Sequence, residues 1–408
     1  MSDIIVQKFG GTSVGSVERI DAVAEIIKNA SLSERIIVVV SAMSGETNKL
    51  VSLAKHFGEN PDKREFDALV STGETISSAL LTMALHSKGI KARSFSATQI
   101  SMKTTSTYSK AKILDIDSNK ILEVIEDGTI PIITGFQGVT ETGDVTTLGR
   151  GGSDTTAVAI AAQVKAKRCD IYTDVDGIYT TDPKIVSNAK KLDSITMEEM
   201  LELAGQGAKV MQTRAVEFAN KYKVPVRVLS SFNEGSGTLI SLEDNGMENS
   251  LVSGIAFQKD QVKVTLHGVE DTPGTAFKIL GPISDAEIEV DVIVQNVSVD
   301  GKTDFTFTVS NEDQEIVKKI VEDVRQKIEF KDLIIDSDIA KVSLVGVIDK
   351  PGVAADIFEP IGKNNINIDM VIQNTSLDGK NANITFTIKQ EDLNKTVDII
   401  SIPLNDQS

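Results

Sequence analysis

Lys8-Phe9-Gly10-Gly11-Thr12-Ser13-Val14-Gly15 is the stretch that decides the expected fold. It follows an apolar, β-branched run at residues 4–7 that predicts a buried strand, and apolar residues recur at helical spacing from residue 17 to 29. Adjacent glycines on a strand-to-helix turn let the backbone approach a ligand, and a helix start adds free N–H groups. With Lys8 at the strand end, the turn predicts an anion site for phosphate, although a plain Gly-rich turn with a solvent-exposed lysine would share this pattern.

Two common phosphate motifs do not fit this turn. A P-loop needs its lysine after the glycines and next to Ser or Thr, whereas Lys8 precedes them. A dinucleotide fingerprint needs G-x-G-x-x-G, whereas Gly10 and Gly11 are adjacent. The turn therefore predicts a phosphate site of another kind.

The composition narrows the class of protein. A chain of 408 residues is long enough for two or three domains, and its net charge of −17 argues against a nucleic-acid partner. One cysteine, Cys169, excludes an internal disulfide framework, and three scattered histidines make a protein-held metal site unexpected. No signal peptide precedes Lys8 and no apolar run looks long enough to span a membrane, so we expect a cytoplasmic location.

Residues 1–232 predict a catalytic domain of the α/β class, with a mostly parallel sheet flanked by helices. Ligands collect at the carboxyl ends of the strands in such sheets, and polar or Gly-rich clusters follow several of these strands. Residues 233–250 are rich in Gly, Ser, Glu and Asn and predict a linker. The expected strands are residues 4–9, 35–41, 92–96, 130–135, 168–173 and 224–229.

A second anion-binding turn is expected at residues 148–156, before an apolar helix. Three glycines, a fixed cation and Ser153-Asp154 at one helix start favour anion recognition. A structural cap would explain Ser153 or Asp154, but not Arg150 among the glycines. Glu74, in Ser71–Glu74, opens another helix, where its carboxylate is either a favourable helix-start charge or a ligand group.

A loop at residues 174–184 is dense in hydroxyls and carboxylates, and a calcium loop is disfavoured because the 12-residue ligand pattern ending in Glu is absent. Two anion turns plus this polar loop predict phosphoryl transfer between a nucleotide and a small acid. Such catalysis depends on positioning and charge neutralisation by Lys, Arg, backbone N–H groups and Mg²⁺.

Five motifs in order resemble those of aspartate kinases, which have the amino acid kinase fold. The resemblance implies transfer of the ATP γ-phosphoryl group, with Mg²⁺, to the side-chain carboxylate of L-aspartate, which gives 4-phospho-L-aspartate for lysine, threonine and methionine synthesis. The motifs are KFGGTSV (8–14), STGE (71–74), GRGGSD (149–154), TDVDGIYTTDP (173–183) and GAKV (207–210).

The resemblance also implies roles for individual residues. Lys8, Arg150 and Asp154 would be catalytic, with Lys8 stabilising the transferring phosphoryl group. Glu74 would hold the substrate ammonium and Arg150 its α-carboxylate, in a substrate pocket completed by Ser41, Thr47 and Ser153. The implied nucleotide site comprises Lys8, Phe9, Gly10, Gly11, Thr173, Asp174, Tyr179, Lys184, Lys209 and Val210. The family frequently has arginine at the position of Lys184. Lysine keeps the positive charge there but cannot form the bidentate hydrogen bonds of a guanidinium.

An internal repeat with an offset of 78 residues follows the linker: residues 263–268 recur at 341–346, 271–274 at 349–352, and 290–296 at 368–374. Two copies indicate a duplicated domain. Each copy resembles an ACT domain, which implies a ferredoxin-like α+β fold at residues 261–338 and 339–408. Because the second copy runs out before its last strand, we expect residues 251–260 to supply it, so that the first copy is inserted within the second.

The ACT resemblance implies feedback inhibition by lysine, threonine or both, and a homo-oligomer, dimer or tetramer, formed through these domains. Alternatives are a dimerisation module without ligand, another kinase acting on glutamate, acetylglutamate, carbamate or a nucleotide, and a non-catalytic amino-acid sensor. Met247 could start a separate regulatory subunit. The expected effector residues are Asp271, Gly274, Thr275, Ala276, Asp291, Gln295, Asn296, Val353, Ala354, Asp369, Gln373 and Asn374.

Overall fold

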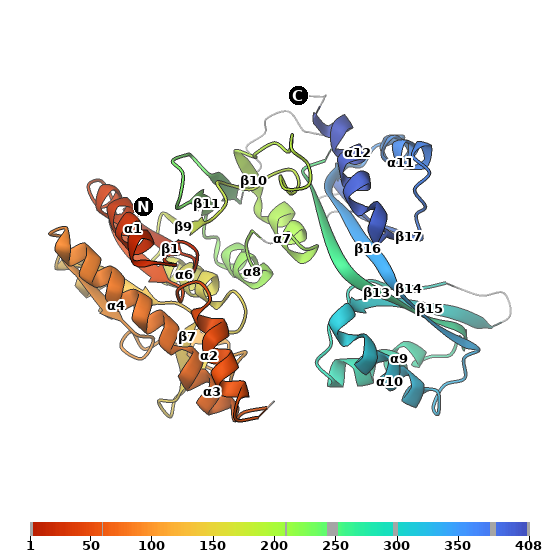
Figure 1. The fold of residues 1–408 in the computed structure, drawn as a ribbon, viewed down its shortest axis with the longest axis horizontal. Coiled ribbons are helices and arrows are strands. Elements are labelled where there is room, and N and C mark those ends of the chain that lie inside the picture. The colour runs from red at the N-terminus through yellow and green to blue at the C-terminus, as the bar shows by residue number, and fades with distance from the viewer. Residues whose placement is uncertain are drawn as a thin grey trace. The chain divides into compact units, whose positions relative to one another are not determined.

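The computed structural model describes residues 3–58, 60–208, 210–242, 252–296, 301–375 and 381–405. Two compact units are present (Figure 1): unit 1 comprises Met1–Thr180 and Lys190–Glu248, and unit 2 comprises Thr181–Ala189 and Asn249–Ser408. Three positions of interest, Lys209, Met247 and Leu251, lie outside the described residues.

Unit 1 is built on an eight-stranded sheet in the order β10-β12-β11-β9-β1-β2-β6-β3. All neighbouring strands run parallel except β11 and β12, which are antiparallel. The apolar, β-branched runs expected to form buried strands do so at the centre of this sheet. Its strands are β1 (Ile4–Phe9), β2 (Arg35–Val40), β3 (Ala92–Phe95), β6 (Ile130–Thr134), β9 (Arg168–Thr173), β10 (Ser194–Thr196), β11 (Val226–Ser230) and β12 (Thr238–Ser241).

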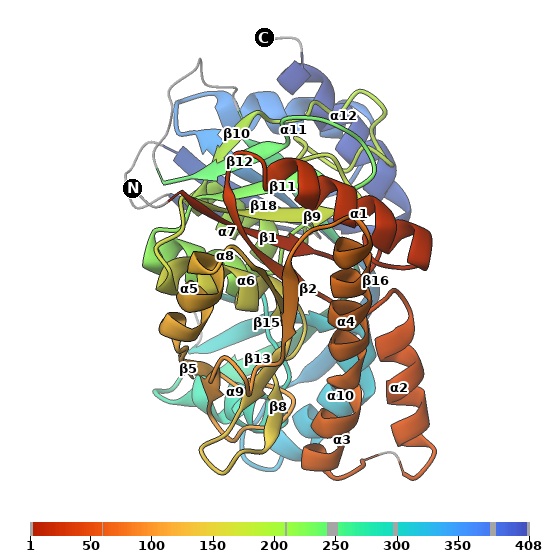
Figure 2. The same ribbon diagram turned by 90° about the vertical axis from the view of Figure 1, so that its left-hand side faces the viewer.

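Helices cover both faces of this sheet. α1 and α4 bury their apolar residues together with Ile5 and Phe9 of β1, and Figure 2 shows the two helices against the sheet. α6 packs against β1, β2 and β9 and contacts α8. The helices are α1 (Val17–Ala30), α2 (Glu46–Lys55), α3 (Lys63–Val70), α4 (Thr72–Ser87), α5 (Ser118–Glu126), α6 (Gly152–Gln163), α7 (Met197–Gly205) and α8 (Thr213–Tyr222).

Unit 1 also has a small four-stranded sheet, whose neighbouring strands follow the order β5-β4-β7-β8. Its strands β7 and β8 pair antiparallel and form a hairpin. Its strands are β4 (Lys103–Thr104), β5 (Ile113–Asp115), β7 (Gln137–Val139) and β8 (Val145–Thr147).

The expected linker at residues 233–250 is wrong in its first part. Thr238–Ser241 forms β12, which pairs with β10 and β11 inside the sheet of unit 1. The Thr238 hydroxyl donates to the Leu192 carbonyl at 2.5 Å and accepts from the Ile178 N–H at 2.8 Å. The Gly- and Ser-rich composition before it concealed a strand of four residues.

Unit 2 is organised around one six-stranded antiparallel sheet, in the order β14-β15-β13-β16-β18-β17. Two strands of 17 residues, β13 and β16, pass through both copies of the repeat. The elements of unit 2 occur in the same order in the two copies: strand, helix, strand, strand and helix, with a short 3-10 helix before the last one. They are β13 (Gly254–Glu270), α9 (Thr275–Asp285), β14 (Ile293–Gln295), β15 (Lys302–Ser310), η1 (Asn311–Asp313), α10 (Gln314–Val324), β16 (Asp332–Ile348), α11 (Val353–Lys363), β17 (Met370–Thr375), β18 (Asn381–Lys389), η2 (Gln390–Asp392) and α12 (Leu393–Asn405).

The first copy is inserted within the second. Gly254 to Gln258 pair with Val345 to Lys341 of the second copy, whereas Lys263 to His267 pair with Asp336 to Asp332 of the first. Val252 and Ile255 are buried in the same apolar cluster as the second copy's Val342 and Phe386. The pairing expected for the segment that follows the linker is therefore found.

Reciprocal ion pairs join the two copies. Lys341 of the second copy pairs with Asp291 of the first, and Lys263 of the first copy lies 3.3 Å from Asp369 of the second. These four residues are related by the repeat offset, so the two contacts are equivalent. The Lys341 side chain is fully buried, whereas that of Lys263 is 19% exposed.

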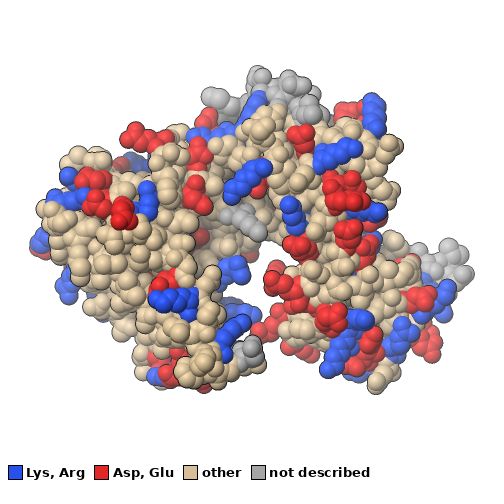
Figure 3. Space-filling view, viewed as in Figure 1, with Lys and Arg blue, Asp and Glu red and all other residues tan. Residues whose placement is uncertain are grey.

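One segment, Lys63–Ser87, is long and apolar enough to pass as a membrane span by length and composition, contrary to expectation. Its apolar residues have another explanation, because Leu81 and Leu85 are fully buried in the core of unit 1. On the face shown in Figure 3, acidic and basic side chains are interspersed.

Candidate active site

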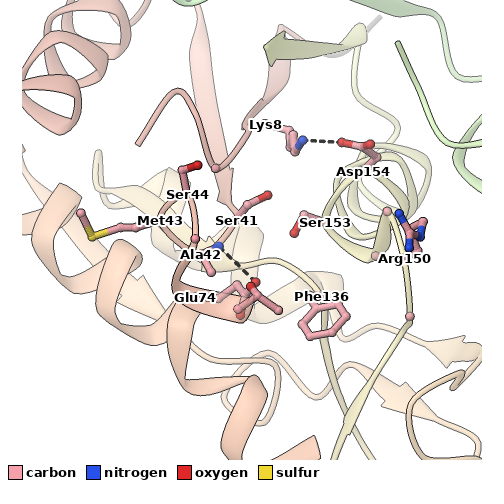
Figure 4. A pocket seen from close by; sticks show the side chains of 16 residues that line it. Lys8, Ser41, Ala42, Met43, Ser44, Glu74, Phe136, Arg150, Ser153 and Asp154 are labelled. Carbon is pink, nitrogen blue, oxygen red and sulfur yellow. Dashed lines mark hydrogen bonds and ion pairs between the residues drawn. The ribbon is translucent and has the colours of Figure 1, made fainter. Parts of the chain in front are cut away.

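A cleft with a volume of about 320 Å³ lies at the carboxyl ends of the central strands of unit 1. Figure 4 shows its side chains, which come from segments far apart in the sequence. This volume is at the lower end of the range typical of small-molecule sites. Its lining comprises Lys8, Gly11, Ser41, Ala42, Met43, Ser44, Gly45, Thr47, Glu74, Phe136, Gly149, Arg150, Gly151, Gly152, Ser153 and Asp154.

Lys8 enters the cleft because side chains alternate along a strand. Its neighbour Phe9 points to the other face, where its ring stacks on Tyr172 with centroids 4.6 Å apart. The Lys8 ammonium lies 2.6 Å from the Asp154 carboxylate at the start of α6, and both side chains are 11% exposed. A fixed positive charge is thereby held at the floor of the cleft.

Glu74 is the second carboxylate in the lining, and it lies in the first turn of α4. The residue is only 3% exposed, and Glu74 Oε1 accepts a hydrogen bond from the Ala42 N–H at 3.1 Å. Burial raises the pKa of Glu74 from 4.5 to about 7, although backbone N–H donors act in the opposite direction. The other oxygen, Oε2, is buried with no hydrogen-bond partner among the described residues. This carboxylate is therefore available to a cationic ligand group.

Arg150 lies on the turn between β8 and α6, and its side chain is exposed. Within the described part of the chain, its guanidinium makes no ion pair, so it is available to an anionic group that enters the cleft. Ser153 follows in the first turn of α6, close against Gly135, where an added Cβ would lie 2.6 Å from the Ser153 Oγ. Figure 4 shows the hydroxyls of Ser41 and Ser153 in the space between Lys8 and Glu74.

The first Gly-rich turn was expected to lead directly into a helix start at the anion site, but α1 does not begin there. Ser16 caps α1 with its own hydroxyl, which accepts from the Arg19 N–H, and five residues separate Gly11 from α1. By contrast α2 and α6 begin after Gly45 and Gly151, which both have left-handed backbone conformations and no side-chain cap. The positive helix ends beside the cleft thus belong to α2 and α6.

The Gly-rich turn contributes close packing. Gly11 leaves no room for a side chain, because a Cβ there would lie 2.9 Å from the Ala42 carbonyl oxygen. The Gly11 carbonyl accepts from the Ser44 N–H at 3.1 Å, which joins this turn to the loop after β2. Gly10 lies next to Lys8, since a Cβ on it would be 3.5 Å from the ammonium.

The residues expected for the nucleotide are only partly brought together. The Gly10 N–H donates to the Tyr172 carbonyl at 3.1 Å, so Thr173 at the end of β9 lies near the Gly-rich turn. Tyr179 donates to Asp176 at 2.8 Å in the following loop, and Thr173 donates to its neighbour Asp174 at 3.1 Å. Phe9 is buried in the core, so only its backbone can contact a ligand.

Two further nucleotide expectations fall elsewhere. Lys184 belongs to unit 2, because Thr181–Ala189 is part of that unit and Val186 is buried in its core. Val210 is half-buried and does not line the cleft. Lys209 lies outside the described residues.

Several lining residues were not singled out as ligands from the sequence. Ala42, Met43, Ser44 and Gly45 lie in the loop of small residues that follows β2, so its composition offered a signal for them. Phe136 left no signal, because its place in the cleft depends on an unusual left-handed backbone conformation, with φ of 67°.

The expected effector residues lie at turns and edges of unit 2. Gln295 donates to Asp271 at 3.3 Å, which joins the end of β14 to the turn before α9. Gly274 and Gly352 have left-handed conformations as N-caps of α9 and α11, so the two copies share this turn. Thr275 and Ala276 follow the first of these glycines, Val353 and Ala354 follow the second, Asn296 accepts from Thr303, and Gln373 and Asn374 lie on β17.

Comparison with known proteins identifies the family. Residues 3–230 match the amino acid kinase family, and residues 264–329 and 342–401 each match ACT domains. An aspartate kinase from Stutzerimonas stutzeri is 55% identical over 372 residues, which cover 90% of each chain. The chain belongs to the aspartate kinase family. A Pseudomonas aeruginosa aspartokinase is 54% identical over 373 residues, covering 90% of each chain, so the similarity extends over most of the chain.

Solved structures of aspartate kinases share this architecture. Escherichia coli aspartokinase III in complex with aspartate and ADP is 27% identical, with a TM-score of 0.82 over 98% of this chain and 100% of that one. The same enzyme in complex with lysine and aspartate gives a TM-score of 0.78 at 26% identity, over 99% of this chain and 100% of that one. The fold class expected from the sequence, an amino acid kinase domain followed by two ACT domains, is confirmed.

Proposed function

We propose that the cleft of unit 1 transfers the γ-phosphoryl group of ATP to the side-chain carboxylate of L-aspartate. The observation that carries the proposal is the arrangement of charge in one cleft. A held cation, Lys8, faces the same space as a buried carboxylate, Glu74, and an exposed guanidinium, Arg150. An α-amino acid needs such a carboxylate for its ammonium and such a guanidinium for its α-carboxylate.

The chemistry assigned to these residues is electrostatic. The aspartate side-chain oxygen attacks the γ-phosphorus, the bond to the β-phosphate oxygen breaks, and ADP leaves. Lys8 stabilises charge on the transferring phosphoryl group, and the uncapped starts of α2 and α6 add N–H donors. Glu74 and Arg150 bind the two ends of the α-amino acid and so orient its side chain toward Lys8.

Mg²⁺ suits this site as an ion carried by the nucleotide. Among the described residues, no group of three or more His, Cys, Asp or Glu could hold a metal. Mg²⁺ is usually bound by one or two carboxylates together with substrate phosphates, and Asp154 is a carboxylate beside Lys8 that fits this pattern. When bound with ATP, the ion would neutralise phosphate charge.

We also infer that Thr173, Asp174, Tyr179, Lys184, Lys209 and Val210 contribute to the nucleotide site. Unit 2 would sense lysine, threonine or both through the turn and strand residues named above, as supported by the lysine complex of the Escherichia coli enzyme. Exposed Ile293 on β14 and Val371 on β17, the two edges of its sheet, favour assembly of a homo-oligomer there. We retain the cytoplasm as the expected location.

The direct test incubates the protein with ATP, Mg²⁺, hydroxylamine and either aspartate or glutamate. Hydroxylamine attacks the acyl carbon of an acyl phosphate and displaces phosphate, which leaves a hydroxamate that forms a coloured complex with added ferric iron. We expect hydroxamate with aspartate and none above background with glutamate. Product with glutamate and none with aspartate would overturn the assignment of aspartate as the substrate. Adding lysine and threonine to the same assay, singly and together, would identify the effector.

A further inference from the structure

The turn that carries Arg150 is held by a side chain from α8, outside the cleft lining. Arg214 Nη1 donates to the Leu148 carbonyl at 2.6 Å, and Nη2 donates to the Ala111 carbonyl at 2.9 Å. The two terminal nitrogens of one guanidinium thus donate to backbone oxygens from two different segments. Leu148 is two residues before Arg150, so this contact acts on the backbone of the turn.

A second side chain, from α3, fixes the strand that leads into the turn. Asp67 on α3 is fully buried and accepts from the Thr147 N–H at 2.7 Å and from the Thr147 hydroxyl at 2.9 Å. The same carboxylate accepts from the Ser109 N–H at 2.8 Å and its hydroxyl at 3.1 Å. The end of β8 therefore cannot shift without breaking charge-assisted hydrogen bonds.

Close packing leaves the turn little freedom beyond those bonds. Gly149 and Gly151 both have left-handed conformations, with φ of 79° and 68°. A Cβ on Gly151 would lie 1.9 Å from the Gln212 side chain, two residues before Arg214, and a Cβ on Gly149 would lie 3.0 Å from the Ser109 carbonyl oxygen. The turn is therefore packed between α8 and the segment near residue 109.

This support matters because Arg150 has none of its own. Its guanidinium is exposed and is not held by an ion pair with any other residue that the structure describes. The position of a long side chain that no ion pair holds depends mainly on its backbone. Misplacement of a binding group by about 1 Å can cost about 100-fold in rate.

We propose that Arg214 is a positioning residue for aspartate, which sets the place of Arg150 through the Leu148 carbonyl. This inference rests on the proposed function, in which Arg150 binds the α-carboxylate of the substrate. Arg214 then controls aspartate affinity without touching aspartate, and it has little influence on ATP. A purely structural role would instead lower stability and leave the two Michaelis constants in their original ratio.

The first experiment compares Arg214→Met and Arg214→Lys with Lys221→Met, a charge-removing control on the same helix whose side chain is exposed. We expect Arg214→Met to raise the KM for aspartate about 10-fold, since hydrogen bonds from a charged donor are lost. The KM for ATP should change less than about twofold. Arg214→Lys should recover part of the loss, because an ammonium cannot reproduce the two-pronged fork, and Lys221→Met should match the wild type.

Thermal melting separates these effects from unfolding. If Arg214→Met melts below the assay temperature, Arg214→Lys decides the question by the same ratio of Michaelis constants. Equal changes in both constants, or none in a folded variant, would overturn the inference.

The second experiment is a double-mutant cycle between Arg150→Gln and Arg214→Met. If Arg214 acts through Arg150, its loss should have little further effect on the KM for aspartate once Arg150 is gone. Additive effects would overturn the inference. If Arg150→Gln alone leaves the KM for aspartate unchanged, the proposed role of Arg150 fails, which is a different outcome.

Discussion

Asp154 at the start of α6 holds the Lys8 ammonium 2.6 Å from its carboxylate, at the end of the central strand β1. The pair joins the two segments that the sequence marked as anion turns. Because Lys8 is one residue before the buried Phe9, strand alternation directs its charge to the face covered by α6. The fold itself thus delivers a cation to the cleft.

Glu74 should make aspartate use depend on pH. Its pKa is raised to about 7 by burial, so below pH 7 the carboxyl is increasingly protonated and cannot pair with the substrate ammonium. We expect kcat/KM for aspartate to fall about tenfold per pH unit on the acid side of 7. The variant Glu74→Gln should be slow throughout and flat between about pH 6 and 8. A flat wild-type profile, or a slope that survives in the variant, would contradict this role.

The same group should destabilise unit 1 as pH rises. The Glu74 pKa is about 7 in the folded state and 4.5 without the fold, so the folded state holds the proton more tightly. The contribution of Glu74 to the free energy of unfolding, about 3 kcal/mol, is therefore fully present below pH 4.5 and is lost as the pH rises through 7. Glu74→Gln, which is neutral at every pH, should gain in melting temperature relative to the wild type between pH 5 and pH 8. A constant difference across this range would refute the prediction.

Gly135 should tolerate no side chain, because it supports the start of α6. A Cβ there would lie 2.6 Å from the Ser153 Oγ and 2.9 Å from its Cα, so Ser153 would have to move. We expect Gly135→Ala to lower the free energy of unfolding by about 1–3 kcal/mol. We also expect kcat/KM to fall by more than the loss of folded protein alone would explain. Gly205→Ala, where an added Cβ meets nothing within 4 Å, is the matched control and should be active and stable.

The two partners of the buried ion pair in unit 2, Asp291 and Lys341, should respond unequally to mutation. Asp291→Ala leaves the fully buried Lys341 ammonium without its partner, which typically costs about 3–5 kcal/mol. Lys341→Met removes the buried charge and leaves a carboxylate that is 31% exposed, so its cost should be about 1 kcal/mol or less. The double variant should regain most of the stability lost in Asp291→Ala, as measured by urea denaturation of the full chain. A double variant as unstable as Asp291→Ala would count against the argument.

Much of the framework was accessible from the sequence. Buried β-branched runs located β1, β2 and β9, and the 78-residue repeat, with the last strand missing from its second copy, predicted the insertion of one copy in the other. The single sheet that runs through both copies was not predicted. Local periodicity could not find β12, because four residues carry too little pattern and their neighbours look like a linker.

The contacts that position the site were less accessible. The motifs containing Lys8, Glu74 and Arg150 named residues that one cleft does bring together. Arg214 was missed because its partners are backbone carbonyls, which any sequence supplies and no motif marks. The capping of α1 by Ser16 likewise depends on where the turn ends, which the glycines alone do not fix.

The central claim, that the Lys8 charge acts on the transferring phosphoryl group, is tested most directly by Lys8→Ala. The measurement is ADP release with saturating ATP, Mg²⁺ and aspartate, beside equilibrium ATP binding, with the exposed Lys28→Ala as control. We predict that turnover falls at least about 100- to 1,000-fold while ATP binding largely survives. A Lys8→Ala protein that turns over at a near-normal rate would contradict the account.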